Sequence, residues 1–309
     1  MNKRNKRILV TGAAGFIGSN VCLELQKQYE VIALDNFSSG IKENLLEFEG
    51  RIIQADIRNF DWQNEKVEAI IHEGAITDTT IKNRELMLDV NFHAFKKIVE
   101  YCENQGINLI YASSASVYGK GKVPMQEEQE KDILSYYAES KWEMDKFAAT
   151  KFSAFEEKGL KLVGLRYFNV YGPKEQHKGK MASMIFQLYN QMKQGKQPRI
   201  FKYGEQTRDQ VYVKDVVKAT LLALEAKKNG VYNVGSGQAT SFNKIVEELN
   251  KNLKTQLKPW YMDNPYKHYQ NATLAELSKA QKFLGYKAEY SIEKGIADYI
   301  TFLENERKN

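Results

Sequence analysis

The sequence has few cysteines, few histidines and no long apolar run. Cysteine occurs only as Cys22 and Cys102, histidine occurs four times, and neither type is clustered at metal-ligand spacing. Disulfide bridges and a metal site are therefore not expected. No stretch approaches the roughly 18 consecutive apolar residues of a membrane-spanning helix, and the basic segment Met1 to Arg7 leads into an expected strand, unlike a signal peptide. We therefore predict a cytoplasmic protein with no membrane partner.

Positive charge is only slightly in excess of negative charge. The 309 residues include 45 Lys and Arg against 39 Asp and Glu, a net charge of +6. The cations are scattered, and no basic stripe with interleaved aromatic residues is present, so nucleic acid is not a predicted partner. A weak positive field suits a phosphorylated small molecule.

Short apolar runs alternate with helical patterns over the first half of the chain. We expect helices over 85–105 and 137–157, and strands at 7–11, 31–34, 51–55, 69–72, 108–112 and 161–165. Repeated alternation of this kind predicts an α/β fold, a doubly wound Rossmann-type parallel sheet.

Beyond about residue 170 the alternation loosens. A loop over 172–180 and a helix over 182–194 are expected, and 230–235 has the pattern of another strand that returns to the main sheet. We therefore predict two interleaved domains. Residues 1–168 with about 209–238 form the cofactor-binding Rossmann domain, and about 169–208 with 239–309 form a smaller α/β substrate domain.

A glycine-rich turn follows the first expected strand. Gly12, Gly15 and Gly18 stand where the chain must turn tightly, approach a pyrophosphate and pack a helix against the sheet. An ordinary strand-to-helix turn is the alternative for an isolated match, but Asp35 also lies about 20 residues on, at a strand end. Asp35 by the usual rule favours NAD, whereas Lys42 could pair with the 2'-phosphate of NADP, so the residues leave the cofactor open.

Hydroxyl residues and a Tyr-Lys pair follow the expected strand at 108–112. Ser113 and Ser114 come at its carboxyl end, where ligands of Rossmann sheets bind. Tyr137 and Lys141 are four residues apart and share a helix face, so the lysine charge is expected to lower the pKa of the phenol from about 10 towards neutrality. Tyr137 could then act as a base. A strand-end hydroxyl that satisfies backbone groups is the alternative role for Ser114.

The order of these motifs resembles the extended short-chain dehydrogenase/reductase family over essentially the whole chain. The resemblance implies that Ser114 hydrogen-bonds the reacting oxygen, that Tyr137 exchanges its proton and that Lys141 binds the nicotinamide ribose. Ala115 and Ser116 differ from the Asp-Glu pair of the sugar 4,6-dehydratases and from the glutamate of the UDP-glucuronate decarboxylases. The segment Arg166 to Pro173 is shared by many nucleotide-sugar enzymes of the family.

A second segment narrows the resemblance. Residues 175–183 and 72–75 resemble the corresponding segments of the ADP-L-glycero-D-manno-heptose 6-epimerases, which supply a lipopolysaccharide precursor. The resemblance implies a nucleotide-linked heptose substrate, reversible oxidation at C6'' and return of the hydride to the opposite carbonyl face. Two acid/base groups are then needed, and Lys178 matches the second. From spacing alone, a lysine that binds phosphate or lies in solvent is the alternative.

The resemblance also implies the rest of the site. It places at the cofactor Gly12, Gly15, Phe16, Ile17, Gly18, Asp35, Asn36, Lys42, Asp56, Ile57, Glu73, Gly74, Ala75, Ile76, Thr77, Asn91, Lys141, Val170 and Lys178. It places at the substrate Ser114, Asn169, Lys180, Gln187, Phe201, Arg208 and Tyr269. Arg208 can clamp a diphosphate through two parallel hydrogen bonds. Lys180 stands where better-known members have serine, and Gln187 where they have histidine.

The resemblance further implies NADP as the cofactor, with NAD as the alternative, and a homo-oligomer. A UDP-hexose 4-epimerase is the alternative enzyme, because the stretch from Ser114 to Gly119 suits it equally well. A nucleotide-sensing Rossmann protein without catalysis is a further alternative of a different class. It is disfavoured, because such proteins usually lose the tyrosine and lysine that are both present here.

Overall fold

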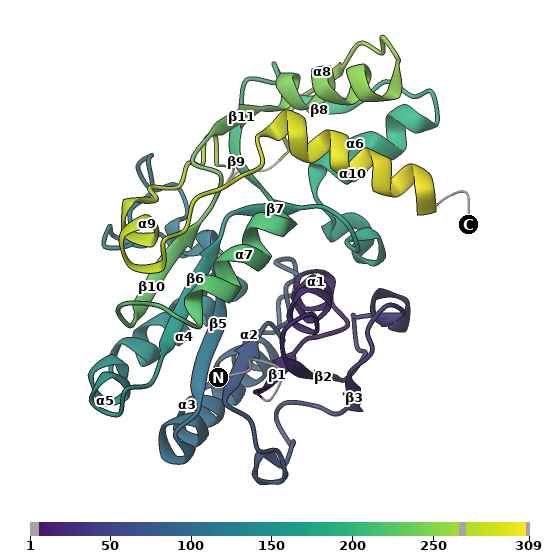
Figure 1. The fold of residues 1–309 in the computed structure, drawn as a ribbon. Coiled ribbons are helices and arrows are strands. Elements are labelled where there is room, and N and C mark those ends of the chain that lie inside the picture. Colours follow the sequence, from purple (N-terminus) through teal and green to yellow (C-terminus); the bar gives the residue numbers. More distant parts are fainter. Residues whose placement is uncertain (1–5, 266–269, 307–309) are drawn as a thin grey trace.

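The computed structural model describes residues 6–265 and 270–306 of the chain. Its main feature is a seven-stranded sheet in the order β10-β6-β5-β4-β1-β2-β3, in which every neighbouring pair is parallel (Figure 1). The strands are β1 (Arg7–Thr11), β2 (Glu30–Asp35), β3 (Arg51–Gln54), β4 (Ala69–His72), β5 (Asn108–Ser114), β6 (Leu162–Tyr167) and β10 (Gly230–Val234). The predicted α/β fold is confirmed, and 230–234 joins the main sheet as expected.

Helices cover both faces of this sheet, which explains why its strands are continuous apolar runs. Side chains alternate along β1, so that Ile8 and Val10 pack on the side of α1 and α7, while Leu9 packs on the side of α3, α4 and α5. The helices of this part are α1 (Phe16–Leu25), α2 (Arg84–Leu88), α3 (Ala94–Gln105), α4 (Tyr136–Ala149), α5 (Phe152–Glu157), α7 (Val213–Ala223) and α9 (Ser278–Leu284).

A smaller cluster of elements lies beyond one end of the main sheet, at the top of Figure 1. It contains α6 (Met184–Lys193), α8 (Phe242–Leu253) and α10 (Ile292–Glu306), whose buried faces form a core of their own. Two small sheets accompany them, one of β11 (Ala239–Ser241), β9 (Thr207–Tyr212) and β7 (Asn169–Tyr171), and one of β12 (Trp260–Met262) and β8 (Arg199–Phe201). The predicted domain boundary near residue 209 falls inside β9.

Two expected helices are interrupted. The stretch over 85–105 contains a π-helical segment, Asp89–His93, between α2 and α3. The stretch over 137–157 breaks after Ala149 into α4 and α5, and the break allows Phe155 to pack fully into the core beside Leu162. No helix within 6–265 and 270–306 is long and apolar enough to cross a membrane.

A buried ion pair joins α4 to the sheet. Arg166 on β6 donates to Asp145 on α4 at 2.8 Å, and both side chains are at most 3% exposed. Asp145 also accepts hydrogen bonds from Tyr111 at 3.0 Å and Ser113 at 2.9 Å, both on β5. Because Lys141 lies one turn before Asp145 on the same helix, this network sets the depth at which α4 presents Tyr137 and Lys141.

We expect Arg166→Leu to lower the free energy of unfolding by about 3–5 kcal/mol, because it leaves the Asp145 carboxylate buried without its cation. Urea denaturation measures the loss. The matched control is Arg84→Leu, in which the same change removes a solvent-exposed ion pair with Glu139. A loss at Arg166 no larger than that of the control would contradict the role given to the buried pair.

Candidate active site

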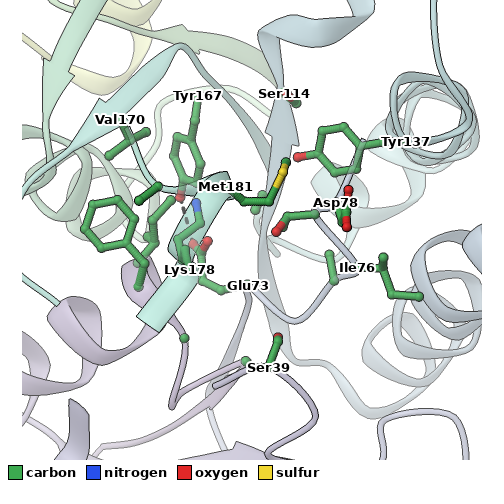
Figure 2. A pocket seen from close by; sticks show the side chains of 18 of the residues that line it. Ser39, Glu73, Ile76, Asp78, Ser114, Tyr137, Tyr167, Val170, Lys178 and Met181 are labelled. Carbon is green, nitrogen blue, oxygen red and sulfur yellow. Dashed lines mark hydrogen bonds between the residues drawn. The ribbon is translucent and has the colours of Figure 1, made fainter. Parts of the chain in front are cut away.

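A cavity of about 1230 Å³ opens at the carboxyl ends of the parallel strands. It lies beside the point where β1 sits between β2 and β4, so that the chain leaves β1 towards α1 on one face and β4 towards α3 on the other. This reversal of direction creates the crevice in which open α/β sheets bind their ligands. Figure 2 shows Ser114, Tyr137, Glu73 and Lys178 around the cavity.

The glycine turn forms one wall of the cavity. Gly12 has a φ of 64°, and a Cβ there would lie 2.6 Å from backbone atoms of Gly74, while a Cβ on Gly18 would collide with the Gly12 carbonyl oxygen. The N-cap of α1, Gly15, has no side-chain cap. The first N–H groups of α1 therefore have no side-chain partner at this end, and the turn fits the pyrophosphate of a dinucleotide.

Asp35 closes the second strand above this turn. Its two carboxylate oxygens accept backbone hydrogen bonds, one from Ala14 N at 2.9 Å and one from Phe37 N at 2.7 Å, and the residue is 7% exposed. The Asp35 side chain thus holds the end of β2 against the glycine turn. Ser38, Ser39 and Gly40 follow it along the cavity wall.

The three residues of the predicted catalytic group lie together. Ser114 ends β5, and it hydrogen-bonds Tyr137 from the first turn of α4. Lys141 is 2% exposed, donates to the Ala112 carbonyl oxygen at 2.7 Å and has its Nζ 6.0 Å from the Tyr137 ring centroid. Burial lowers the pKa of Lys141 to about 8, against the opposing effect of Glu73 and Asp145.

The expected lowering of the Tyr137 pKa is wrong for this structure. Removal of the phenol from solvent raises its pKa, and an ionised Glu73 carboxylate raises it further, while the hydrogen bond with Ser114 acts in the opposite direction. The Lys141 ammonium, which should have lowered it, donates to a backbone carbonyl instead.

Lys178 reaches the cavity from a different element. It lies in a 3-10 helix, η6 (Gln176–Met181), with its Nζ 5.5 Å from the Phe16 ring centroid, and burial lowers its pKa. Glu175 anchors this segment, since its buried carboxylate accepts from Gly172 N at 3.1 Å and Ser183 Oγ at 2.8 Å. In Figure 2, Lys178 and Tyr137 approach the cavity from different sides.

Most residues expected from the sequence line this one cavity. They are Gly12, Gly15, Phe16, Ile17, Gly18, Asp35, Asn36, Asp56, Ile57, Glu73, Gly74, Ala75, Ile76, Thr77, Ser114, Tyr137, Lys141, Asn169, Val170, Lys178, Lys180, Gln187, Phe201 and Arg208. Within the described part of the chain no cluster of His, Cys, Asp and Glu could hold a metal ion.

Three expected residues are placed differently. Lys42 does not line the cavity, and its Nζ lies 5.9 Å from the Phe37 ring centroid. Asn91 is fully buried behind the cavity wall, where it accepts from Ile76 N at 2.8 Å and donates to Ile76 O at 3.0 Å. Tyr269 lies outside the described residues.

Gln187, predicted at the substrate, also has a structural contact. Its amide nitrogen donates to Ala182 O at 2.8 Å and Lys180 O at 3.2 Å, so it ties the segment that carries Lys178 to α6.

Other cavity residues were not expected from the sequence. The unpredicted lining residues include Asp78, Tyr167, His177, Met181, Arg199 and Gln210. Asp78 follows the expected strand at 69–72 within one loop, which is a signal that could have found it.

Comparison with known proteins identifies the class. The profile of the NAD dependent epimerase/dehydratase family matches residues 8–235, and the chain belongs to this family. It is 36% identical to the ADP-L-glycero-D-manno-heptose-6-epimerase of Brachyspira hyodysenteriae, over 96% of this chain and 98% of that protein.

Two solved structures have the same fold over nearly the whole chain. The ADP-L-glycero-D-manno-heptose-6-epimerase of Helicobacter pylori superimposes with a TM-score of 0.91 at 37% identity, covering 98% of each chain. The UDP-N-acetylglucosamine 4-epimerase of Methanobrevibacter ruminantium, solved with UDP-N-acetylmuramic acid, also has a TM-score of 0.91, at 29% identity over 98% of this chain and 99% of that one.

We expect Gly18→Ala to weaken dinucleotide binding and to destabilise the fold by about 1–3 kcal/mol, because the new Cβ displaces the Gly12 backbone. Nicotinamide fluorescence titration and urea denaturation measure the two effects. The control is Gly106→Ala at the end of α3, where no atom lies within 4 Å of the added Cβ but φ is 74°. The control should lose stability and keep its dinucleotide affinity; equal affinities in both variants would argue against the turn as the binding site.

Proposed function

We propose that this protein is a nucleotide-sugar epimerase that converts ADP-D-glycero-β-D-manno-heptose to ADP-L-glycero-β-D-manno-heptose. The observation that carries the proposal is the presence of Lys178 and Tyr137 in one cavity, on separate elements. An epimerase that removes and returns a hydride on opposite faces of one carbon needs an acid/base group for each face. The heptose epimerases of Brachyspira hyodysenteriae and Helicobacter pylori support the choice of sugar.

Each residue has a defined part in the proposed reaction. A bound nicotinamide cofactor supplies the acceptor and later the donor of the hydride. In one orientation of the substrate, Tyr137 takes the proton of the C6'' hydroxyl as the hydride leaves the carbon, and Ser114 hydrogen-bonds the same oxygen. After the exocyclic group of the ketone has rotated, Lys178 donates a proton to that oxygen as the hydride returns, and proton exchange with solvent restores both groups. The lowered pKa of Lys178 makes its amine easier to deprotonate, as an acid/base group requires.

Arg208 is proposed to bind the diphosphate of the substrate. It is 8% exposed on β9 and lines the cavity together with Lys180 and Arg199. Three cations in the lining of one cavity suit a doubly charged pyrophosphate. We propose the division of labour that the sequence suggested, with residues 1–168 and about 209–238 holding the cofactor and about 169–208 and 239–309 holding the sugar nucleotide.

The proposed epimerisation can be tested directly with purified protein. Purified protein mixed with ADP-D-glycero-D-manno-heptose should form the L-glycero epimer without added cofactor, as followed by NMR. Tyr137→Phe and Lys178→Met should each lower turnover by about 100-fold or more, since each removes an acid/base group. Tyr136→Phe and Lys120→Met are matched controls on exposed side chains outside the cavity.

Failure of this conversion would overturn the proposal. Turnover of a UDP-hexose in its place would support a 4-epimerase, the alternative that the Methanobrevibacter ruminantium structure favours at 29% identity. Normal turnover in Lys178→Met, with Tyr137→Phe inactive, would leave an oxidoreductase site without the second acid/base group.

We propose NADP as the cofactor. Both oxygens of Asp35 are engaged by backbone N–H groups, so the carboxylate is not aimed freely at a ribose 2' position. Beyond Asn36 and Phe37, the cavity wall continues with Ser38, Ser39 and Gly40, which are small and uncharged and leave room for a 2'-phosphate. Lys42 lies just beyond them and is proposed to approach this phosphate.

The cofactor assignment has a direct test. Mass spectrometry of the dinucleotide released by denaturation should identify NADP or NADPH. Lys42→Ala should weaken NADP binding several-fold and leave NAD binding unchanged, because only NADP carries the 2'-phosphate. Release of NAD alone, with equal effects of Lys42→Ala on both dinucleotides, would reverse the assignment.

A further inference from the structure

A chain of four oxygen atoms leads from the cavity into the core. Glu73 follows β4 in the cavity wall, and its Oε1 lies 2.7 Å from the hydroxyl oxygen of Tyr167 on β6. That hydroxyl oxygen lies 3.1 Å from Thr220 Oγ1 on α7, and Thr220 Oγ1 lies 3.0 Å from the Val216 carbonyl oxygen. Tyr167, Thr220 and Val216 are all buried.

The number of protons available along this chain favours one protonation state of Glu73. The three contacts join oxygen atoms, so each needs one proton to be a hydrogen bond. Tyr167 and Thr220 supply one hydroxyl proton each, and the Val216 carbonyl supplies none. A Glu73 carboxylate would leave one contact with no proton between two oxygens, whereas a carboxylic acid satisfies all three. The acid then donates to Tyr167, Tyr167 donates to Thr220, and Thr220 donates to Val216.

We propose that Glu73 stands in this site as a neutral carboxylic acid, a positioning residue that holds Tyr167 and keeps negative charge away from Tyr137 and Lys141. The inference rests on the proposed function for its catalytic consequence, but not for the protonation itself. Withdrawal from solvent raises the pKa of Glu73 to about 7, in agreement with the proton count. The hydrogen bond with Tyr167 and the Lys141 charge act in the opposite direction.

The groups around Glu73 define the effect of its ionisation. They are Tyr137 and Lys141 from α4, Tyr167 from β6, Cys22 from α1, the neighbouring His72 of β4 and Lys178 of η6, which lines the same cavity. Burial lowers the pKa of His72 to about 3 and raises that of the Cys22 thiol, so both are neutral near pH 7. A negative Glu73 would raise the pKa of Tyr137 and so weaken it as a base.

The protonation can be tested without any substrate. Infrared difference spectra of wild type against Glu73→Gln should contain the C=O stretch of a protonated carboxyl at low pH, and this band should disappear as pH rises through about 7. Glu175→Gln, at a second buried carboxyl, is the control for bands that do not belong to Glu73. No Glu73 band below about pH 6 would overturn the proposal, whatever the activity of the protein.

Stability provides an independent readout. The folded protein keeps the Glu73 proton to a pKa of about 7, whereas the unfolded chain releases it near 4.5, so ionisation between these values favours the unfolded state. The stability of wild type relative to Glu73→Gln should therefore fall as pH rises from about 4.5 to 7 and stay constant above. A constant difference over this window would contradict the raised pKa.

Measurements of turnover distinguish a catalytic effect of the Glu73 proton from a purely structural one. Near pH 6, Glu73→Gln should retain more turnover than Glu73→Leu, because its amide N–H donates to Tyr167 as the acid does. It should also lose the ionisation near pH 7 from the pH profile of kcat. Glu73→Leu, which cannot donate, should lose about tenfold at every pH. A Gln variant as impaired as Leu would show that the carboxylate is the working form.

Discussion

The close contact between the ends of β1 and β4 is the constraint on which the site depends. A Cβ on Gly12 would lie 2.6 Å from the Gly74 backbone, and a Cβ on Gly74 would make a tight contact of 3.2 Å with the Gly12 nitrogen. Gly18 brings α1 against the same turn. This contact places the start of α1 and the Glu73 segment on either side of one crevice. The crevice between these segments stays open because these positions carry no side chain.

Burial governs the chemistry of the groups that surround the crevice. It lowers the pKa values of Lys141 and Lys178 and raises those of Tyr137 and Glu73, so each group is pushed towards its neutral form. For Lys141, Lys178 and Glu73 the shift brings the pKa nearer to 7, where proton exchange is more favourable. The raised pKa of Tyr137 instead keeps its phenol protonated near pH 7.

The two sides of the site are held by different means. Tyr137 and Lys141 depend on α4, which the buried Asp145 and Arg166 pair fastens to the sheet. Lys178 depends on a short segment closed by Glu175 and Gln187, whose partners are largely backbone groups. The first side is therefore part of the rigid Rossmann core, while the second belongs to the loop between β7 and α6 and can vary among relatives without changing the fold.

The amino-acid sequence alone was sufficient to predict each feature that depends on one local rule. The apolar runs located the strands of the main sheet, the glycine spacing located the dinucleotide turn, and the interval of four residues brought Tyr137 and Lys141 to one helix face. The apolar pattern of 230–234 also predicted that this strand joins the main sheet, because a buried strand there has few other places to pair.

Tertiary structure decided everything that depends on neighbours distant in the chain. The Tyr137 pKa rises because solvent is excluded and Lys141 donates to Ala112 instead, neither of which the spacing of the two residues contains. Asn91 binds the backbone of Ile76 because a π-helical segment turns it inward. The proton on Glu73 follows from Tyr167 and Thr220, which lie 94 and 147 positions further along the chain. They meet Glu73 only in the folded sheet, where β6 lies one strand away from β4 with β5 between them. Sequence thus determined which groups are present, and packing determined their charge, because the free energy of ionisation depends on solvent and on partners that only the fold assembles.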